Sequence, residues 1–339
     1  MTDSPASAPA LLRRLPLTGL YPAGYRAAHG EEITAVFAEA LQRADPRTAL
    51  REWAALAAHA VRLRTRLSSS DPAGRILAGA APFLLAGAAA LGAVQLLIGL
   101  LLGGSATDTD WAVGTAQTAP WVLALVCAAL GRWAPARALV LAAVATGTAV
   151  AVAALFHPTA AFTQYSELLG LWAVTGVLVL IAPPDAVDLS RRGRSWAVGS
   201  AVAIALPMSG IALFWIGTWP EEYPNVLFPP STQALLDAST AWPVLVLSLV
   251  YLVRLGRPNT DPLQAGGVAL AVLPWTLMVA PPLYRSTPVD APDLLRNAGV
   301  VLALLATATA AGILRRTSRR ARLTGPVGPV GPRASDPAA

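Results

Sequence analysis

The sequence predicts an all-α fold: a polytopic membrane bundle of about eight transmembrane helices with a cytoplasmic N-terminal helical hairpin. The first observation is composition, because 55% of the 339 residues are hydrophobic and only 13% are charged, whereas soluble domains carry about 25% charged residues. The second is a series of eight apolar runs that contain no Asp, Glu or Arg. The third is that arginines fall in alternate connections between these runs. Together these observations favour a membrane protein.

The section before the first apolar run, residues 11–70, predicts a cytoplasmic amphipathic helical prefix domain. Two segments, 22–44 and 46–67, place apolar residues at the 3.6-residue spacing of a helix. Asp45 and Pro46 separate them, an N-cap residue followed by proline at the first helical position. A hairpin of this size has too little core to be stable alone, so we expect the membrane surface, the bundle or another chain to cover it.

The eight apolar runs predict a transmembrane domain over residues 75–315, after a short polar hinge at 68–74. A hydrocarbon core about 30 Å thick selects helices of about 20 apolar residues, and a charged residue at its centre costs about 2.5–3.5 kcal/mol. The predicted spans are 76–102, 111–130, 138–156, 168–182, 197–219, 238–253, 263–283 and 297–314.

Arginine placement predicts the orientation of the chain. The connections after spans two, four and six carry Arg, and those after spans one, three and five carry none. The connection after span seven carries Arg285 and, next to span eight, Arg296, but five arginines follow span eight within residues 315–322. Positive residues favour the cytoplasmic side, so both termini are expected there, as disordered tails over residues 1–10 and the basic, Pro- and Gly-rich residues 316–339. All 25 basic residues are Arg, and the abundant Ala, Gly and Pro are typical of a GC-rich bacterial genome. We therefore expect the bacterial cytoplasmic (inner) membrane.

Residues that usually carry chemistry are missing from the predicted spans. No acidic residue lies in any of them, which disfavours proton or sodium coupling. The sequence lacks the phosphate-binding, zinc-helix and serine-elbow motifs, and its one cysteine, Cys127, excludes an intramolecular disulfide. We expect no enzyme, no catalytic residue, no cofactor and no metal site. Because the arginines lie at span ends rather than in one patch, direct nucleic-acid binding is not expected either.

The run YPAGYRAAHGEE at residues 21–32 carries a resemblance to known proteins. It resembles the helical prefix that precedes the membrane spans of many bacterial permease-like and sensor-like proteins, whose genes often accompany PadR-type regulators. The resemblance covers about residues 11–67 and implies a regulatory or assembly role for the prefix. Many permease members have a large extracytoplasmic domain, whereas this chain has only short outward loops. The candidate partner-binding residues are Tyr21, Tyr25, Arg26, His29, Glu31, Glu32, Phe37 and Trp53.

Two functions from different classes follow from these patterns. The first is a non-enzymatic regulatory or sensor subunit, or a permease-associated one, that couples the membrane bundle to a cytoplasmic partner. Its expected partners are membrane lipid and a cytoplasmic regulatory protein or permease subunit. The alternative is a transporter or permease component for a neutral or apolar substrate, which fits spans rich in small residues and free of buried charge.

Overall fold

The computed structural model describes residues 20–42, 45–101, 109–156, 160–218, 230–257, 260–277 and 291–323. In this described part every regular element is a helix, as the sequence predicts. By length and composition four helical stretches can cross a membrane: Pro72–Leu101, Ala112–Ala129, Trp133–Ala153 and Arg191–Phe214. Three shorter apolar stretches lie at Leu169–Ile181, Ala241–Leu255 and Ala298–Leu314. The fold is therefore all-helical, with several apolar helices that indicate a membrane protein.

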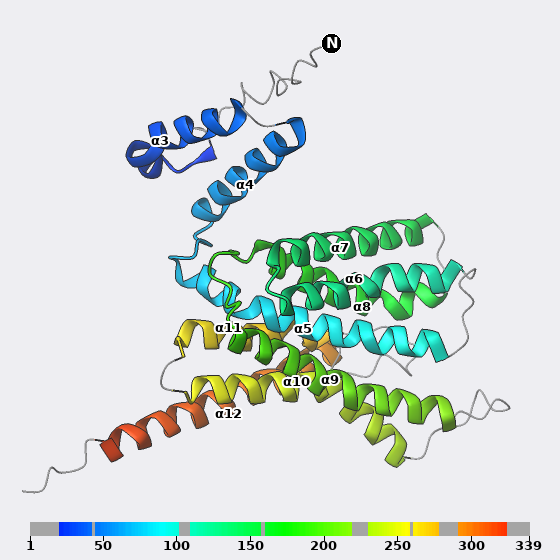
Figure 1. Ribbon diagram of the computed structural model, residues 1–339. Coiled ribbons are helices and arrows are strands. Elements are labelled where there is room, and N and C mark those ends of the chain that lie inside the picture. Colours follow the sequence, from blue (N-terminus) through cyan, green and yellow to red (C-terminus); the bar gives the residue numbers. More distant parts are fainter. Residues whose placement is uncertain are drawn as a thin grey trace, which may run out of the picture.

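A helix overlaps each predicted span, although the bounds differ and only the first part of the span predicted at 263–283 lies in the described residues (Figure 1). The helices are α3 (Ala23–Gln42), α4 (Pro46–Arg64), α5 (Pro72–Leu101), α6 (Thr109–Ala129), α7 (Trp133–Phe156), α8 (Ala160–Ile181), α9 (Arg191–Thr218), α10 (Pro230–Leu255), α11 (Pro262–Val272), the 3-10 helix η1 (Leu273–Leu277) and α12 (Ala291–Leu323).

Two helix bounds depart from the sequence prediction for identifiable reasons. Helix α11 changes to 3-10 geometry at Leu273, directly before Pro274, whose ring cannot continue the regular hydrogen-bond pattern. The predicted span 263–283 extends past η1 into residues outside the described part. Helix α12 continues through residues 316–323, which the sequence assigns to a disordered tail. Its last turns are rich in arginine, a good helix former whose charge is favourable at a helix C-terminus.

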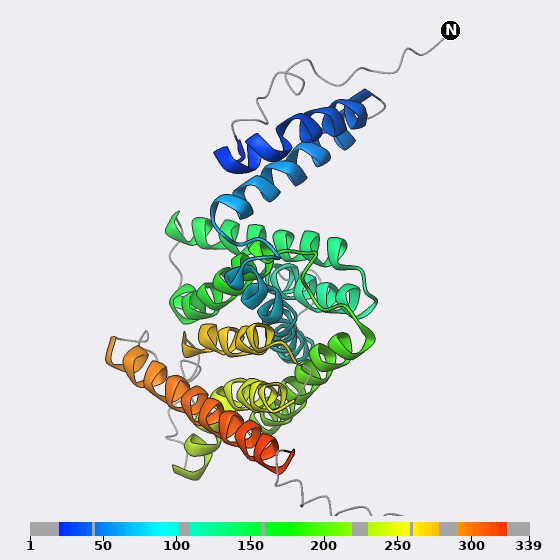
Figure 2. The same ribbon diagram turned by 90° about the vertical axis from the view of Figure 1, so that its left-hand side faces the viewer.

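Helices α3 and α4 form the predicted hairpin, which stands outside the bundle near one of its ends (Figures 1 and 2). Asp45 is the N-cap of α4, as predicted, and its side chain accepts a hydrogen bond from the backbone N–H of Thr48 at 3.2 Å. Pro46 occupies the first helical position, where its missing N–H leaves no bond unmade.

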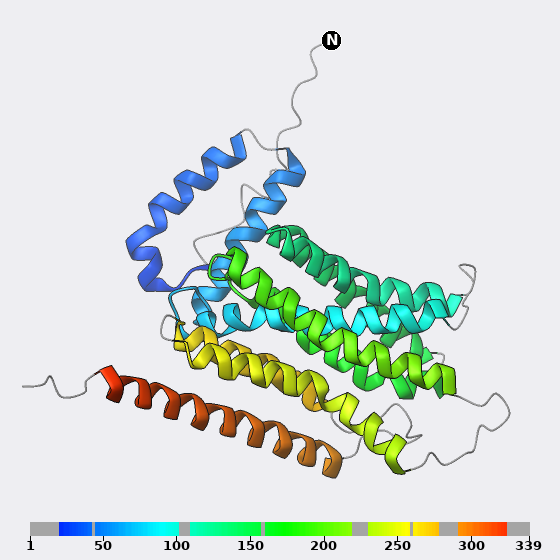
Figure 3. The ribbon, with the colours of Figure 1, turned by 60° about the horizontal axis from the view of Figure 1, so that its bottom comes forward.

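Helix α5 is the centre of the bundle. It packs against α6, α8, α9 and α11, and 56% of its most apolar stretch is buried, against 17–22% in the other three long apolar helices. Figures 1 and 3 show α5 enclosed by neighbours, whereas α12 lies along the outside next to α10. A helix that is apolar on all sides is expected to take this central position.

Helices α5 and α11 cross with their backbones close together. A Cβ added to Gly79 of α5 would lie 2.5 Å from the carbonyl oxygen of Gln264, and one added to Gly267 of α11 would lie 2.5 Å from the backbone N of Ala80. The two glycines therefore let the backbones touch. Close packing through small residues is how helices associate where lipid removes the hydrophobic driving force.

The chain direction alternates from helix to helix along the bundle (Figures 1 and 3). As a result the start of α5 and the α6–α7, α8–α9 and α10–α11 connections gather at the end nearest the hairpin. We call this the hairpin end. The far ends of α5, α7 and α9 lie at the opposite end of the bundle.

Candidate functional site

An aromatic cluster of Tyr21, Tyr25, His29 and His59 joins the two hairpin helices. The Tyr21 ring stacks on Tyr25 with centroids 5.4 Å apart and lies 6.0 Å from the His59 ring, while Tyr25 lies 4.8 Å from His29. Tyr21 is only 2% exposed, and its hydroxyl donates to the carbonyl oxygen of Leu56 at 3.3 Å. The cluster thus holds the start of α3 against α4.

The cluster brings together three of the predicted partner-binding residues, Tyr21, Tyr25 and His29. Sequence reasoning missed its fourth member, His59 of α4. The one available signal was the position of His59 beside the apolar stripe of that helix, between Leu56 and Leu63. Contacts across more than 30 residues of chain do not follow from helical periodicity alone.

The other predicted partner-binding residues are spread over the hairpin. Arg26, Glu31 and Glu32 are exposed, and Glu32 lies 3.7 Å from the Nδ1 atom of His29. The side chain of Phe37 lies outside the described part. Trp53 is half-buried, and its indole N–H is buried without a hydrogen-bond partner among the described residues.

Among the described residues of the hairpin, three large apolar side chains are exposed. Val36 of α3 is 62% exposed, and Leu50 and Val61 of α4 are 56% and 55% exposed. Scattered exposed apolar side chains are ordinary on a protein surface. A two-helix hairpin, however, has few apolar side chains with which to build a core of its own. These positions are therefore the part of the hairpin surface best suited to another apolar surface.

Burial sets the protonation behaviour of the cluster. The pKa of Tyr21 is raised by burial and then by the nearby Tyr25, against a smaller opposing effect of Arg62. The pKa of His59 is lowered below its usual 6.5 by burial and then by Arg62, while Asp185 acts in the opposite direction. Asp185 belongs to the α8–α9 connection, which lies at the hairpin end of the bundle.

A structured turn, which we call the elbow (residues 65–74), connects the hairpin to α5. Arg66 has a positive φ of 56°, its N–H donates to Leu63 O at 3.4 Å, and the N–H of Leu67 donates to Arg62 O at 2.8 Å. This is the Schellman pattern of a helix C-terminus, with arginine at the position that usually holds glycine. The end of α4 therefore has a defined geometry.

The second half of the elbow packs against the first turn of α5. The Ser68 hydroxyl donates to the Asp71 carboxylate at 2.6 Å, and the N–H of Asp71 donates to the Ser68 carbonyl oxygen at 3.1 Å. A Cβ added to Gly74 would overlap the Ser68 carbonyl and lie 2.8 Å from Leu67 O. The stretch that the sequence predicts as a polar hinge is thus a hydrogen-bonded turn seated on the central helix.

Arginines organise the hairpin end of the bundle. Arg75, in the first turn of α5, pairs with Asp261, the N-cap of α11, at 2.6 Å. Arg254 lies 3.7 Å from Asp188 and 5.0 Å from the centre of the Phe83 ring of α5. These contacts tie α10, α11 and the α8–α9 connection to the same central helix.

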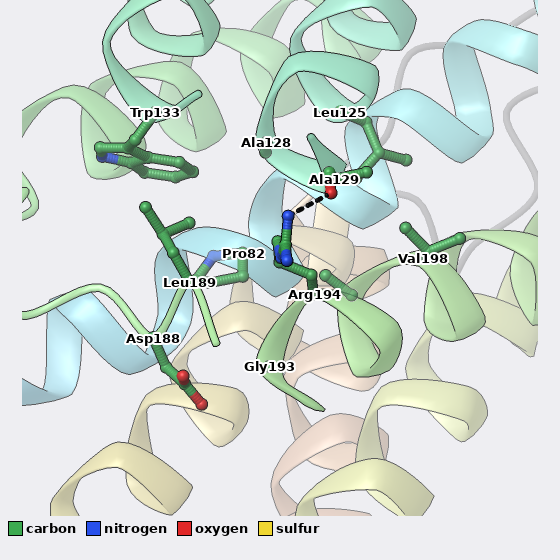
Figure 4. Close-up of a pocket in the computed structure, with 11 residues that line it drawn as sticks. Pro82, Leu125, Ala128, Ala129, Trp133, Asp188, Leu189, Gly193, Arg194 and Val198 are labelled. Atoms are coloured by element: carbon green, nitrogen blue, oxygen red, sulfur yellow. Dashed lines mark hydrogen bonds between the residues drawn. The ribbon is translucent and has the colours of Figure 1, made fainter. Parts of the chain in front are cut away.

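Two more arginines satisfy helix C-termini, whose last carbonyls have no partner within their own helix. Arg194 donates to the carbonyl oxygen of Ala129 at 2.9 Å (Figure 4), and Arg137 donates to that of Leu180. The cavity beside Arg194 measures about 10 Å³, room for at most about one water molecule. The helix ends around Arg194 are therefore closely packed.

The fold and these contacts define an all-helical protein with several apolar helices and an N-terminal helical hairpin. Among the described residues no group of three or more His, Cys, Asp or Glu side chains is placed to hold a metal ion. Comparison with protein-family models, curated proteins and solved structures gave no match. The resemblance of residues 21–32 to bacterial prefix modules accordingly stays a prediction.

Proposed function

We propose that the chain is an integral protein of the bacterial inner membrane that crosses the bilayer eight times, with both termini in the cytoplasm. The alternating chain direction supports this topology, as does a helix at every predicted span. Arg75, Arg137, Arg194 and Arg254 belong to the hairpin end, whereas Arg296, in the first turns of α12, belongs to the opposite end. The excess of arginine at one end is the distribution expected of a cytoplasmic face.

Within this topology the hairpin acts as an adaptor that couples the bundle to a cytoplasmic partner, a regulatory protein or a permease subunit, without catalysis. The observation that carries this proposal is the elbow. Its hydrogen bonds and the close contact at Gly74 define the path of the chain between the hairpin and α5, and α5 packs against four other helices. A displacement of the hairpin would therefore be transmitted to α5 and to the helices packed against it.

The exposed apolar positions of the hairpin are where the partner would bind. A photocrosslinking residue placed at Leu50 or Val61 of the full-length protein tests this in living cells. We expect a crosslink to one defined protein from both positions, lost when Tyr21→Ala removes the stacking that aligns α3 with α4. The exposed polar position Glu52 is the control, at which the same product should be much weaker. Equal yields at all three positions would contradict the adaptor proposal.

The transporter alternative makes a different prediction. Purified protein in vesicles would then carry a neutral solute across the bilayer, and changes at Leu50 or Val61 would leave that flux unchanged. Flux of this kind, together with failure of the crosslinking experiment, would replace the adaptor proposal.

A further inference from the structure

Helices α9 and α10 run side by side (Figures 1 and 3), but they do not close on each other. Between them lies a groove with a volume of about 1090 Å³. Its lining consists of Arg191, Arg192, Ser195, Trp196, Gly199, Ser200 and Ala203 of α9 and Trp242, Leu245, Val246, Leu249 and Val250 of α10. A groove of this size would accommodate a long flexible molecule.

The walls of the groove are apolar along most of its length. The Ser195 and Ser200 hydroxyls donate to the carbonyl oxygens of Arg191 and Trp196, four residues earlier on their own helix, both at 2.8 Å. At the inner end the indole N–H of Trp242 donates to the Ala203 carbonyl oxygen at 2.7 Å. The polar atoms of the walls are therefore satisfied within the protein, which leaves a surface for hydrocarbon.

The mouth of the groove is positively charged. Arg191 and Arg192 form the first turn of α9 at the hairpin end, and both are exposed. Neither side chain has an ion-pair partner among the described residues, in contrast to Arg75 and Arg254 at the same end of the bundle. Arg257 stands close by, with its guanidinium 4.7 Å from the centre of the Trp196 ring.

The charge at the mouth of the groove and the length of the groove together indicate which kind of molecule it binds. From Arg191 to Ala203 the helical rise of 1.5 Å per residue gives about 18 Å, close to half of a hydrocarbon core about 30 Å thick. Guanidinium groups bind phosphate through paired N–H donors. We propose that the groove binds one anionic phospholipid of the cytoplasmic leaflet, with its phosphate on Arg191 and Arg192 and its acyl chains between Gly199 and Leu249.

This inference rests on the proposed membrane topology, so the first measurement checks that topology separately. Full-length protein should float with vesicles in a density gradient and stay with them after alkaline washing. If the protein fails to float, both the membrane topology and the lipid site are wrong. If it floats but shows no lipid preference, only the lipid site is wrong.

The second measurement is native mass spectrometry of protein taken from vesicles with equal amounts of phosphatidylglycerol and phosphatidylcholine of the same chain length. We expect one retained phosphatidylglycerol and little phosphatidylcholine. The double variant Arg191→Gln, Arg192→Gln should lower that preference about thirtyfold, because each arginine near the membrane surface contributes about fivefold. Its matched control removes the same charge elsewhere, with Arg51→Gln and Arg132→Gln, and should keep the preference. An equal loss in both double variants would indicate bulk attraction and overturn the site.

A third variant tests the apolar part of the groove without changing charge. Nothing lies within 4 Å of a Cβ added at Gly199 or at Gly210, which lies three turns further along α9 beyond the groove. Gly199→Leu should block retention of the lipid, whereas Gly210→Leu should leave it unchanged. Retention by the Gly199→Leu protein at the level of the unmodified one would contradict the proposal.

Discussion

Adjacent glycines on α11 offer a sharp test of how the bundle is packed. Gly267 faces α5, and a Cβ on it would meet the backbone N of Ala80 at 2.5 Å and the backbone C of Gly79 at 2.6 Å. A Cβ on Gly266 would meet nothing within 4 Å. Gly266→Ala and Gly267→Ala therefore make the same chemical change, one in open space and the other in the helix crossing.

The size of the difference follows from the geometry. Ordinary Cβ contacts lie at 3.4–4 Å, so Gly267→Ala forces the two backbones apart by about 1 Å. Overpacking of this kind costs about 1–3 kcal/mol, and a gap of about 1 Å forfeits up to about half of each dispersion contact along the crossing. Gly266→Ala should not lower the free energy of unfolding, and the better helix propensity of alanine should raise it by up to about 1 kcal/mol.

The measurement is unfolding of the purified protein by SDS titration from mild detergent, followed by tryptophan fluorescence. Gly79→Ala, on the opposite side of the crossing, should be destabilising as well, because its Cβ would lie 2.5 Å from Gln264 O. The double variant should cost less than the sum of the two single changes, since one separation relieves both contacts. Equal midpoints for Gly266→Ala and Gly267→Ala would refute the close crossing of α5 and α11.

Three further predictions concern the hairpin and the elbow. Gly74→Ala should raise protease cleavage within residues 65–71 severalfold, because its Cβ would overlap the Ser68 carbonyl; unchanged cleavage would count against the elbow. Arg66→Gly should slow amide exchange in the last turn of α4 about fivefold, because glycine avoids the cost of about 1 kcal/mol for a positive φ; exchange that is unchanged or faster would contradict the Schellman assignment. The pKa of His59 is lowered in the folded hairpin, so protonation favours the open form and the hairpin should loosen as pH falls below about 6.5. Spin-label distances across α3 and α4 should broaden between pH 8 and pH 5 in the unmodified protein and in His29→Gln but not in His59→Gln; equal broadening in His59→Gln would assign the effect to another group.

The sequence predicts where the helices lie because apolar runs and caps are local signals. Asp45 shows this well, since an acidic residue before proline identified the start of α4 and the structure places its carboxylate on the N–H of Thr48. The central place of α5 was not predicted, although the sequence holds a signal for it, because its most apolar stretch has the highest hydropathy of the four long ones. That signal does not say which helices surround α5.

Features without a local sequence signal, or that depend on contacts between distant residues, could not be predicted in the same way. Arg66 occupies the position of a Schellman turn where glycine is usual. The sequence therefore gave no indication of this turn. His59 joins Tyr21 across 38 residues of chain. The groove between α9 and α10 is lined by Gly199 and Ala203 on one side and Leu245 and Leu249 on the other, an arrangement that only the packed helices define.

The eight-crossing topology is the claim on which the adaptor and lipid proposals depend, and single-cysteine labelling tests it most directly. In a Cys127→Ala background, cysteines at Leu101 and Phe156 report on the far end of the bundle, and cysteines at Ser190 and Thr260 report on the hairpin end. With a membrane-impermeant thiol reagent, we expect labelling of the first pair in intact spheroplasts and of the second pair only in inverted vesicles. Labelling of Ser190 or Thr260 from outside, or of all four positions from the same side, would contradict it.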